Sequence, residues 1–129
     1  MKHEIIGGQF ALSDGTKLPL SKAARAGDFI FLAGQLALDS DGRLRGDDIE
    51  MQTRQCIENI RSLLGQADCD LSDIVKATVW LADRANFSGF NKIYAEYFAT
   101  NPPTRSAVCS ELMLPGALVE IEVLAYHPV

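Results

Sequence analysis

Asn101–Tyr126 reads NPPTRSAVCSELMLPGALVEIEVLAY, and this stretch decides how the chain folds. It holds two strand-like runs joined by the loop Glu111–Gly116. The simplest arrangement pairs the two runs antiparallel, which would bring Arg105 and a glutamate, Glu120 or Glu122, to the same edge or face. Charges inside apolar strands are costly to bury unless they are paired. We therefore look here first for functional chemistry.

The last strand of this stretch has one apolar row and one mixed row. The apolar row, which suits packing under helices, consists of Val119, Ile121, Val123 and Ala125. The opposite row consists of Leu118, Glu120, Glu122, Leu124 and Tyr126. A sheet face this apolar is rarely left bare in water. We infer homo-oligomerisation through this face, with the carboxylates in a cleft between subunits.

Upstream of this stretch, helical and strand periods alternate. A helical period predicts a helix from about Asp48 to Ala67, and an apolar run predicts a strand over Asp73–Ala82. Asp83 or Asn86 caps a second helix, which Pro102-Pro103 ends. The apolar face of the first helix is formed by Cys56, Ile57, Ile60, Leu63, Leu64 and Ala67. That of the second helix is formed by Phe87, Phe90, Tyr94, Tyr97 and Phe98.

The N-terminal part predicts a hairpin and turns. Lys22–Ala26 and Asp28–Gly34 flank a Gly-Asp turn, and Phe29–Ala33 is apolar enough for a central strand covered on both faces. Residues 1–21 are mixed, with turn chemistry at Gly7-Gly8 and at 13–16. The whole pattern indicates an α+β fold in which a mixed sheet carries two helices on one face, in a single domain over 1–129.

Composition excludes several classes of function. The 129 residues carry a formal net charge of -5, which disfavours nucleic acid and anionic membranes as partners. Three cysteines without paired spacing favour reduced thiols and a cytoplasmic location, as does the lack of a signal peptide or a membrane-spanning run. The only histidines, His3 and His127, have no Cys or His partner at ligand spacing, so no metal site is expected. No phosphate loop or dinucleotide motif predicts a cofactor.

Several short motifs carry a resemblance to a known family. They occur in the order Ala33-Gly34-Gln35, Thr53…Asn59-Ile60, Asp73–Val79, Asn91…Tyr94…Tyr97-Phe98, Pro103-Thr104-Arg105-Ser106 and Val119-Glu120-Ile121-Glu122. With these motifs, the chain from about Pro19 to Ala125 resembles the RidA family, also called YjgF/YER057c/UK114, the reactive intermediate deaminases. The Arg-Ser and Glu-Ile-Glu elements are specific in combination.

The resemblance implies a chorismate-mutase-like fold, a homotrimer and three clefts between subunits. Family members hydrolyse enamine and imine intermediates such as 2-aminoacrylate to 2-keto acids and ammonia, without metal or cofactor. Arg105 matches the arginine that binds the substrate carboxylate, and Glu120 matches the carboxylate that holds the attacking water. Asn91 and the backbone at Gly34 and Ala107 match positions that line the cleft. The expected ligand is therefore a small carboxylated imine, an enamine or a keto acid.

Two positions differ from the usual family pattern. Many deaminating members carry a tyrosine before the second strand, where the register from Gly34-Gln35 back to Pro19 places Leu20. The cysteine that often follows Arg-Ser is Ala107 here, and Cys109 lies two positions further on the same face. Imine hydrolysis needs no thiol, so the cysteine change matters little. Loss of the tyrosine removes a polar group beside the substrate.

Other interpretations of the same residues stay open. Taken alone, an arginine that starts a strand is usually a surface or ion-pair residue, and a Glu-x-Glu strand is usually a solvated edge. The first alternative function is a ligand-binding or regulatory trimer that holds a keto acid in the same cleft without turnover. The second is an endoribonuclease or translation inhibitor, after older family labels. The acidic charge and the lack of a histidine pair oppose this second alternative.

Overall fold

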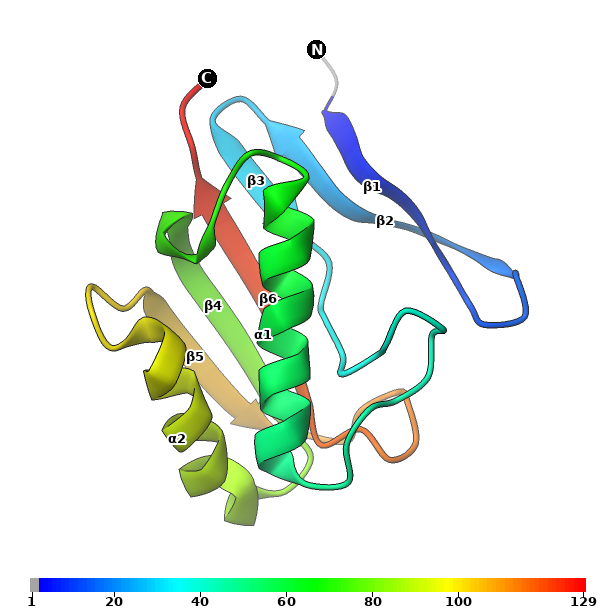
Figure 1. Cartoon of the computed structure of the whole chain (residues 1–129), viewed down its shortest axis with the longest axis vertical. Coiled ribbons are helices and arrows are strands. Elements are labelled where there is room, and N and C mark those ends of the chain that lie inside the picture. Colours follow the sequence, from blue (N-terminus) through cyan, green and yellow to red (C-terminus); the bar gives the residue numbers. More distant parts are fainter. Residues whose placement is uncertain (1–2) are drawn as a thin grey trace.

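The computed structural model describes residues 3–129, which form one six-stranded sheet with two helices on one of its faces (Figure 1). The strands are β1 (Glu4–Ala11), β2 (Lys17–Ala26), β3 (Phe29–Leu32), β4 (Ile74–Leu81), β5 (Thr104–Cys109) and β6 (Val119–Tyr126). The helices are α1 (Ile49–Gly65) and α2 (Phe87–Phe98), with short 3-10 turns η1 (Leu71–Asp73) and η2 (Arg84–Asn86). The strand order is β1-β2-β3-β6-β4-β5, and only β4 and β5 run parallel. The predicted α+β class with a mixed sheet is confirmed.

The predicted pairing between the two C-terminal strands is wrong. β4 lies between β5 and β6 and pairs with both of them. The connection β4–α2–β5 is a crossover unit, which returns β5 parallel to β4 on its outer edge. β6 then occupies the inner edge of β4. The short loop between β5 and β6 therefore passes over the end of β4 and does not close a hairpin.

The core lies between the sheet and the two helices. The apolar row of β6 is buried as predicted, with Val119 and Ala125 at 0% exposure. α1 begins where the sequence indicated, because the Asp48 carboxylate accepts a hydrogen bond from the Met51 backbone N–H at 2.8 Å. From α1, the fully buried side chains include Ile57, Ile60 and Leu64, and each such side chain contributes about 1.5–3 kcal/mol when removed from water.

The N-terminal prediction missed a strand. Residues Glu4–Ala11 form β1 at the sheet edge, and Gly7 and Gly8 lie inside it as an irregularity in the pairing with β2. Both glycines have φ of +77°, a conformation that glycine adopts without strain. The turn at 13–16 is confirmed by a hydrogen bond from the Leu12 N–H to the Thr16 carbonyl at 2.7 Å. The hairpin between β2 and β3 also forms as predicted.

The face of the sheet opposite the helices, here called the open face, is covered by no helix or strand of residues 3–129 (Figure 1). β3 shows this clearly: Ile30 and Leu32 are buried under the helices, whereas Phe29 and Phe31 are 41% and 49% exposed. The expectation that β3 is covered on both faces is therefore wrong for the single chain. Tyr126 packs its ring against Phe29 on the same face, with centroids 5.2 Å apart. An apolar surface of this kind is typical of an interface.

Neither helix of residues 3–129 has the length and apolar character needed to cross a membrane.

Candidate active site

Arg105 lies on β5 and points toward α2. It pairs with Ala77 of β4, whose side chain is fully buried under the helices, so Arg105 belongs to the helix-covered face. The Arg105 guanidinium carbon lies 4.8, 5.3 and 5.7 Å from three ring centroids, those of Tyr94, Phe90 and Phe87. Such contacts contribute about 0.5–1 kcal/mol each at partly exposed sites. The side chain is half-buried in a cradle of aromatic rings.

The charge of Arg105 has no anionic partner in the described part of the chain. Within residues 3–129, no carboxylate lies at ion-pair distance from its guanidinium, although five other ion pairs form. Arg54 shows the usual arrangement: it also stacks on a ring, that of Tyr97, but forms an ion pair with Glu96 at 3.0 Å. The five N–H groups of the Arg105 guanidinium therefore remain available to an anionic ligand.

Tyr94 adds a polar group beside Arg105, a placement that neither the apolar face of the second helix nor the motif Asn91…Tyr94 predicted. Its side chain is 7% exposed, and its hydroxyl is buried without a hydrogen-bond partner among the described residues. Burial raises the pKa of the Tyr94 hydroxyl, while the charge of Arg105 acts in the opposite direction. The signal in the sequence was the spacing of Phe87, Phe90 and Tyr94, which places three rings on one side of α2.

Asn91 and Ala107 are close in sequence to the residues that form this cradle. Asn91 follows Phe90 on α2 and is half-buried. Ala107 lies two residues after Arg105 on β5, so both side chains point to the same face, and Ala107 is exposed. Three of the six predicted site residues therefore belong to the neighbouring elements α2 and β5.

Glu120 and Gly34 form a second group, on the other side of the sheet. Glu120 alternates with the buried residues of β6 and therefore lies on the open face. Its carboxylate packs directly on Gly34, where an added Cβ would collide with the Glu120 Oε2 atom and stand 3.0 Å from its Cδ. Burial, and then the neighbouring charge of Glu122, raises the pKa of the Glu120 carboxyl. Gly34 is thus the residue that leaves space for this half-buried carboxylate.

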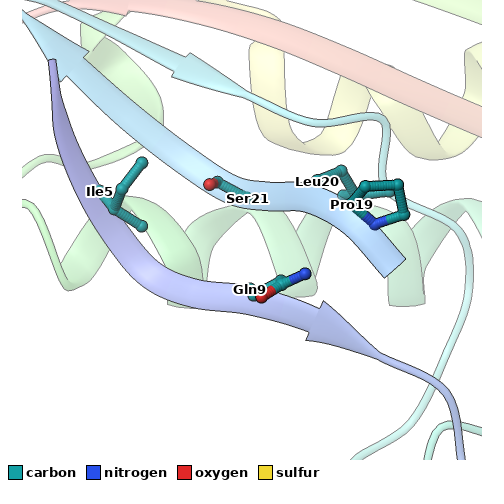
Figure 2. A pocket seen from close by; sticks show the side chains of 5 residues that line it. All are labelled: Ile5, Gln9, Pro19, Leu20 and Ser21. Atoms are coloured by element: carbon teal, nitrogen blue, oxygen red, sulfur yellow. The ribbon is translucent and has the colours of Figure 1, made fainter. Parts of the chain in front are cut away.

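Leu20 lies at a third place, near the opposite edge of the sheet. It lines an open pocket of about 430 Å³ between β1 and β2, together with Ile5, Gln9, Pro19 and Ser21 (Figure 2). Three strands, β3, β6 and β4, separate β2 from β5. At about 4.8 Å per strand, Leu20 and Arg105 lie on strands roughly 19 Å apart.

One chain therefore does not bring the six predicted residues into one pocket. Arg105 and Glu120 pair with Ala77 and Trp80, three residues apart on β4, and they lie on opposite faces. The expectation that Arg105 meets a glutamate at one edge or face of a hairpin is wrong for the single chain, because β4 separates the two strands. Leu20 and Arg105 do not share a pocket within one chain.

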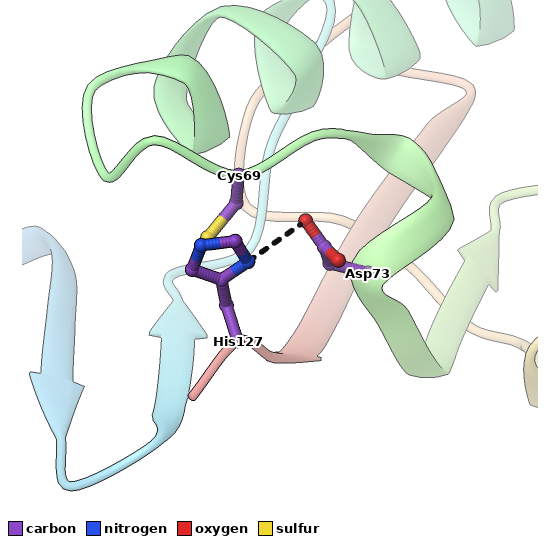
Figure 3. A group of neighbouring side chains, drawn as sticks. All are labelled: Cys69, Asp73 and His127. Carbon is purple, nitrogen blue, oxygen red and sulfur yellow. Dashed lines mark ion pairs between the residues drawn. The ribbon is translucent and has the colours of Figure 1, made fainter. Parts of the chain in front are cut away.

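The described cysteines differ in their surroundings. Cys56 is fully buried in α1, and burial raises the pKa of its thiol far above the ordinary value, which makes it a poor nucleophile. Cys109 is exposed at the end of β5. Cys69 lies beside Asp73 and His127 (Figure 3), so the expectation that His127 lacks a ligand partner is wrong. Sequence spacing could not reveal this group, because the fold joins residues 58 positions apart.

Comparisons with known proteins agree with this fold and these motifs. The family model described as endoribonuclease L-PSP matches residues 13–127. A RutC family protein of Pyrococcus horikoshii is 43% identical over 109 residues, which cover 84% of this chain and 86% of the relative. The human protein named 2-iminobutanoate/2-iminopropanoate deaminase is 34% identical over 116 residues, 89% of this chain and 85% of that protein.

Solved structures show the same architecture. The structure of YyfA from Yersinia pestis, described as a member of the conserved Rid protein family, has a TM-score of 0.85 and 38% identity, covering 97% of this chain and 99% of the other. Yeast Mmf1 has a TM-score of 0.87 and 28% identity, covering 98% and 99%. By family model, sequence identity and fold, the chain belongs to the RidA (YjgF/YER057c/UK114) family, the family also described as endoribonuclease L-PSP.

Proposed function

We propose that this protein is an imine deaminase that hydrolyses reactive 2-imino acids and their enamine tautomers to 2-keto acids and ammonia. The observation that carries the proposal is Arg105, a half-buried guanidinium that stands in an aromatic cradle and has no carboxylate partner within residues 3–129. Such a group suits the carboxylate of a small substrate, because its planar fork binds both oxygens. Human and goat relatives named 2-iminobutanoate/2-iminopropanoate deaminase support the same reaction class.

In the proposed mechanism, the substrate carboxylate binds Arg105 of one copy and one water is held by Glu120 of a neighbouring copy, because the two residues lie on opposite faces of the sheet within one chain. The water oxygen bonds to the C=N carbon as the π electrons of that bond move to nitrogen, and Glu120 accepts a proton from the water. From the protonated imine this gives a neutral carbinolamine, and Glu120 returns its proton to the amino nitrogen. The C–N bond then breaks, ammonia leaves with the bonding pair, and the hydroxyl oxygen forms the C=O bond as its proton passes to solvent. An iminium carbon is already electrophilic, so orientation and charge placement supply the catalysis, and the chemistry calls for no metal or cofactor.

The elevated pKa of Glu120 fits this role. A carboxylate that holds its proton more tightly than a solvated glutamate is a better base toward water. Gly34 supports the same group by leaving room for the carboxylate against the backbone. Asn91 and the backbone of Ala107 complete the proposed cleft next to Arg105.

We propose that the working form is a homotrimer with the site between copies. Two observations support this assembly: Leu20 and Arg105 lie near opposite edges of the sheet, and the open face exposes Phe29, Phe31 and Tyr126. Packing open faces together would remove these side chains from water, and a cyclic arrangement would place the β2 side of one copy near the β5 side of the next. The cytoplasmic location expected from three unpaired cysteines is part of the same proposal.

Two other functions use the same family features. A regulatory trimer would hold a keto acid on Arg105 without turnover, and the free guanidinium alone does not distinguish it from an enzyme. A ribonuclease would need groups that move protons on RNA. His127, however, lies 3.4 Å from the carboxylate of Asp73, just before β4, and the net charge of the chain is -5. The free cation in an aromatic cradle favours a small carboxylated ligand over RNA.

The test uses 2-iminopropionate generated in place by an amino-acid oxidase acting on alanine. A deaminase accelerates the release of both keto acid and ammonia above the spontaneous rate, with saturation in substrate. Binding of pyruvate without accelerated release would favour the regulatory trimer. RNA cleavage that survives repurification and the substitution Arg105→Ala would favour the ribonuclease.

A further inference from the structure

Three side chains from separate parts of the chain converge at one end of the molecule (Figure 3). Cys69 lies in the connection after α1, Asp73 ends η1, and His127 follows β6. Each offers one ligand atom, and these atoms all lie within 4.8 Å of one another. The sulfur is on the inner side, since Cys69 is 7% exposed, whereas the side chains of Asp73 and His127 are 25% and 37% exposed.

The chemistry of this group matches a zinc site. A thiolate, an imidazole and a carboxylate are the three ligand types that Zn²⁺ prefers. Nδ1 of His127 and Oδ2 of Asp73 lie 3.4 Å apart. Two ligands at 2.0–2.1 Å from a tetrahedral zinc stand about 3.4 Å from each other, so this pair already has the spacing of two zinc ligands. The partial exposure of both residues leaves a fourth position open to water.

The backbone around the three residues is anchored by hydrogen bonds. The Cys69 N–H donates to the Leu64 carbonyl at 3.0 Å, and the His127 N–H donates to the Asp28 carbonyl at 2.8 Å. The Asp73 Oδ2 atom accepts the Asp70 N–H at 2.9 Å, in a capping box that holds the carboxylate in place. Contacts of this kind orient metal ligands and reduce the cost of forming the site.

The charges that face the group sum to an acidic environment. Burial and then the charge of Asp73 raise the pKa of the Cys69 thiol, and Asp68 and Asp70 act in the same direction, while Arg25 is the opposing cation. Arg25 is turned toward backbone oxygens, with its guanidinium donating to the carbonyls of His127 at 3.0 Å and Ala67 at 3.4 Å. Three carboxylates against one guanidinium favour a cation.

We propose that Cys69, Asp73 and His127 bind a divalent zinc ion that ties the segment after β6 to the connection between α1 and β4. On zinc binding, the Cys69 thiol releases its proton to solvent and the resulting thiolate coordinates the metal. The site is separate from the proposed deaminase residues: Asp73 precedes β4, and Glu120 pairs with Trp80 near the other end of that strand. Seven residues of strand place the two about 20 Å apart.

The experiment titrates Co²⁺, a spectroscopic substitute for Zn²⁺, into the reduced full chain after treatment with a chelator. We expect one equivalent per chain, with a thiolate-to-cobalt charge-transfer band and the visible bands of tetrahedral cobalt, all displaced by Zn²⁺ and not by Mg²⁺. Zn²⁺ should also raise the Tm of the wild type. Cys69→Ser should abolish the charge-transfer band, and His127→Gln should weaken Zn²⁺ binding by about 100-fold or more.

Cys109→Ser is the matched control, because Cys109 is a thiol outside the group and should leave the band unchanged. His127→Gln guards against a folding defect in Cys69→Ser, since the His127 side chain is partly exposed and its substitution leaves the core intact. Any one of three results would overturn the proposal: no charge-transfer band in the wild type, a band that depends on Cys109, or equal Zn²⁺ affinity in His127→Gln and wild type.

Discussion

Replacing Arg105 probes the proposed carboxylate contact. Arg105→Ala removes the charge and the fork, and Arg105→Lys keeps the charge but loses the planar fork. A charge-assisted hydrogen bond to a ligand contributes about 1.5–3 kcal/mol. At 1.36 kcal/mol per factor of ten, its loss lowers kcat/KM on carboxylated imines by about 10- to 150-fold.

Replacing Arg105 should lower the free energy of unfolding only slightly, so the loss of stability can be measured separately from the loss of kcat/KM. Within residues 3–129, Arg105 has no ion pair to break, and its substitution forgoes only the contacts with the rings of Phe87, Phe90 and Tyr94. At about 0.5–1 kcal/mol for each ring contact, the free energy of unfolding should fall by no more than about 3 kcal/mol.

The assay follows keto-acid and ammonia release from iminopropionate for wild type and both variants, with thermal unfolding and light scattering on the same samples. Arg54→Ala is the matched control, since Arg54 also stacks on a ring but is paired with Glu96 and lies outside the proposed cleft. We expect wild-type kcat/KM in this control. Near-normal kcat/KM in Arg105→Ala would refute the mechanism.

Three further predictions concern the other site residues. Gly34→Ala should displace the Glu120 carboxylate and lower kcat by about 100-fold. Gly65→Ala is the control and should keep wild-type kcat, because an added Cβ there meets nothing within 4 Å. Equal kcat in both variants would show that Gly34 does not position Glu120. Because burial and Glu122 raise the pKa of Glu120 above 4.5, kcat/KM should increase with pH through a value above 4.5 as Glu120 ionises. Glu122→Gln should lower the pH at which kcat/KM rises, because the charge of Glu122 raises the pKa of Glu120. The same substitution should weaken trimer assembly more than it lowers the turnover of the trimers that do form. A stable but inactive trimer with an unchanged pH profile would mean that the roles of the two glutamates are reversed. Leu20 gives the cleft an apolar wall, so kcat/KM should be about 10- to 100-fold higher for the leucine-derived imine than for iminopropionate, at about 0.8 kcal/mol per buried CH₂. Leu20→Tyr should reduce this ratio. A wild-type preference for the smaller imine would contradict the role given to Leu20.

The elements of the fold were predictable where a local pattern fixed them. The period of the first helix, the alternating rows of β6 and the hairpin between β2 and β3 all follow from residues close in sequence. β1 was missed because Gly7-Gly8 resembles a turn, whereas the pairing with β2 accommodates both glycines within a strand.

Long-range placement was the part that local patterns could not supply. Nothing in the sequence between Arg105 and Glu120 indicates that β4 comes between their strands, because that position depends on the crossover through α2. The aromatic cradle of Arg105 depends on how the adjacent elements α2 and β5 pack, and the group around His127 joins residues up to 58 positions apart in the chain. The identities of the candidate residues came from the family motifs, and their separation within one chain became visible only in the structure.

In the proposed trimer, imine hydrolysis takes place in a site that two copies of the chain build together. Turnover in mixed assemblies of Arg105→Ala and Leu20→Glu chains tests this proposal, since each variant should be a trimer and inactive alone. The added carboxylate of Leu20→Glu should repel the substrate carboxylate. If Leu20 and Arg105 of one site come from different copies, random equimolar mixing restores intact sites to about one quarter of the total, and with them about one quarter of wild-type turnover. Mixed trimers that stay as inactive as either parent would contradict the claim.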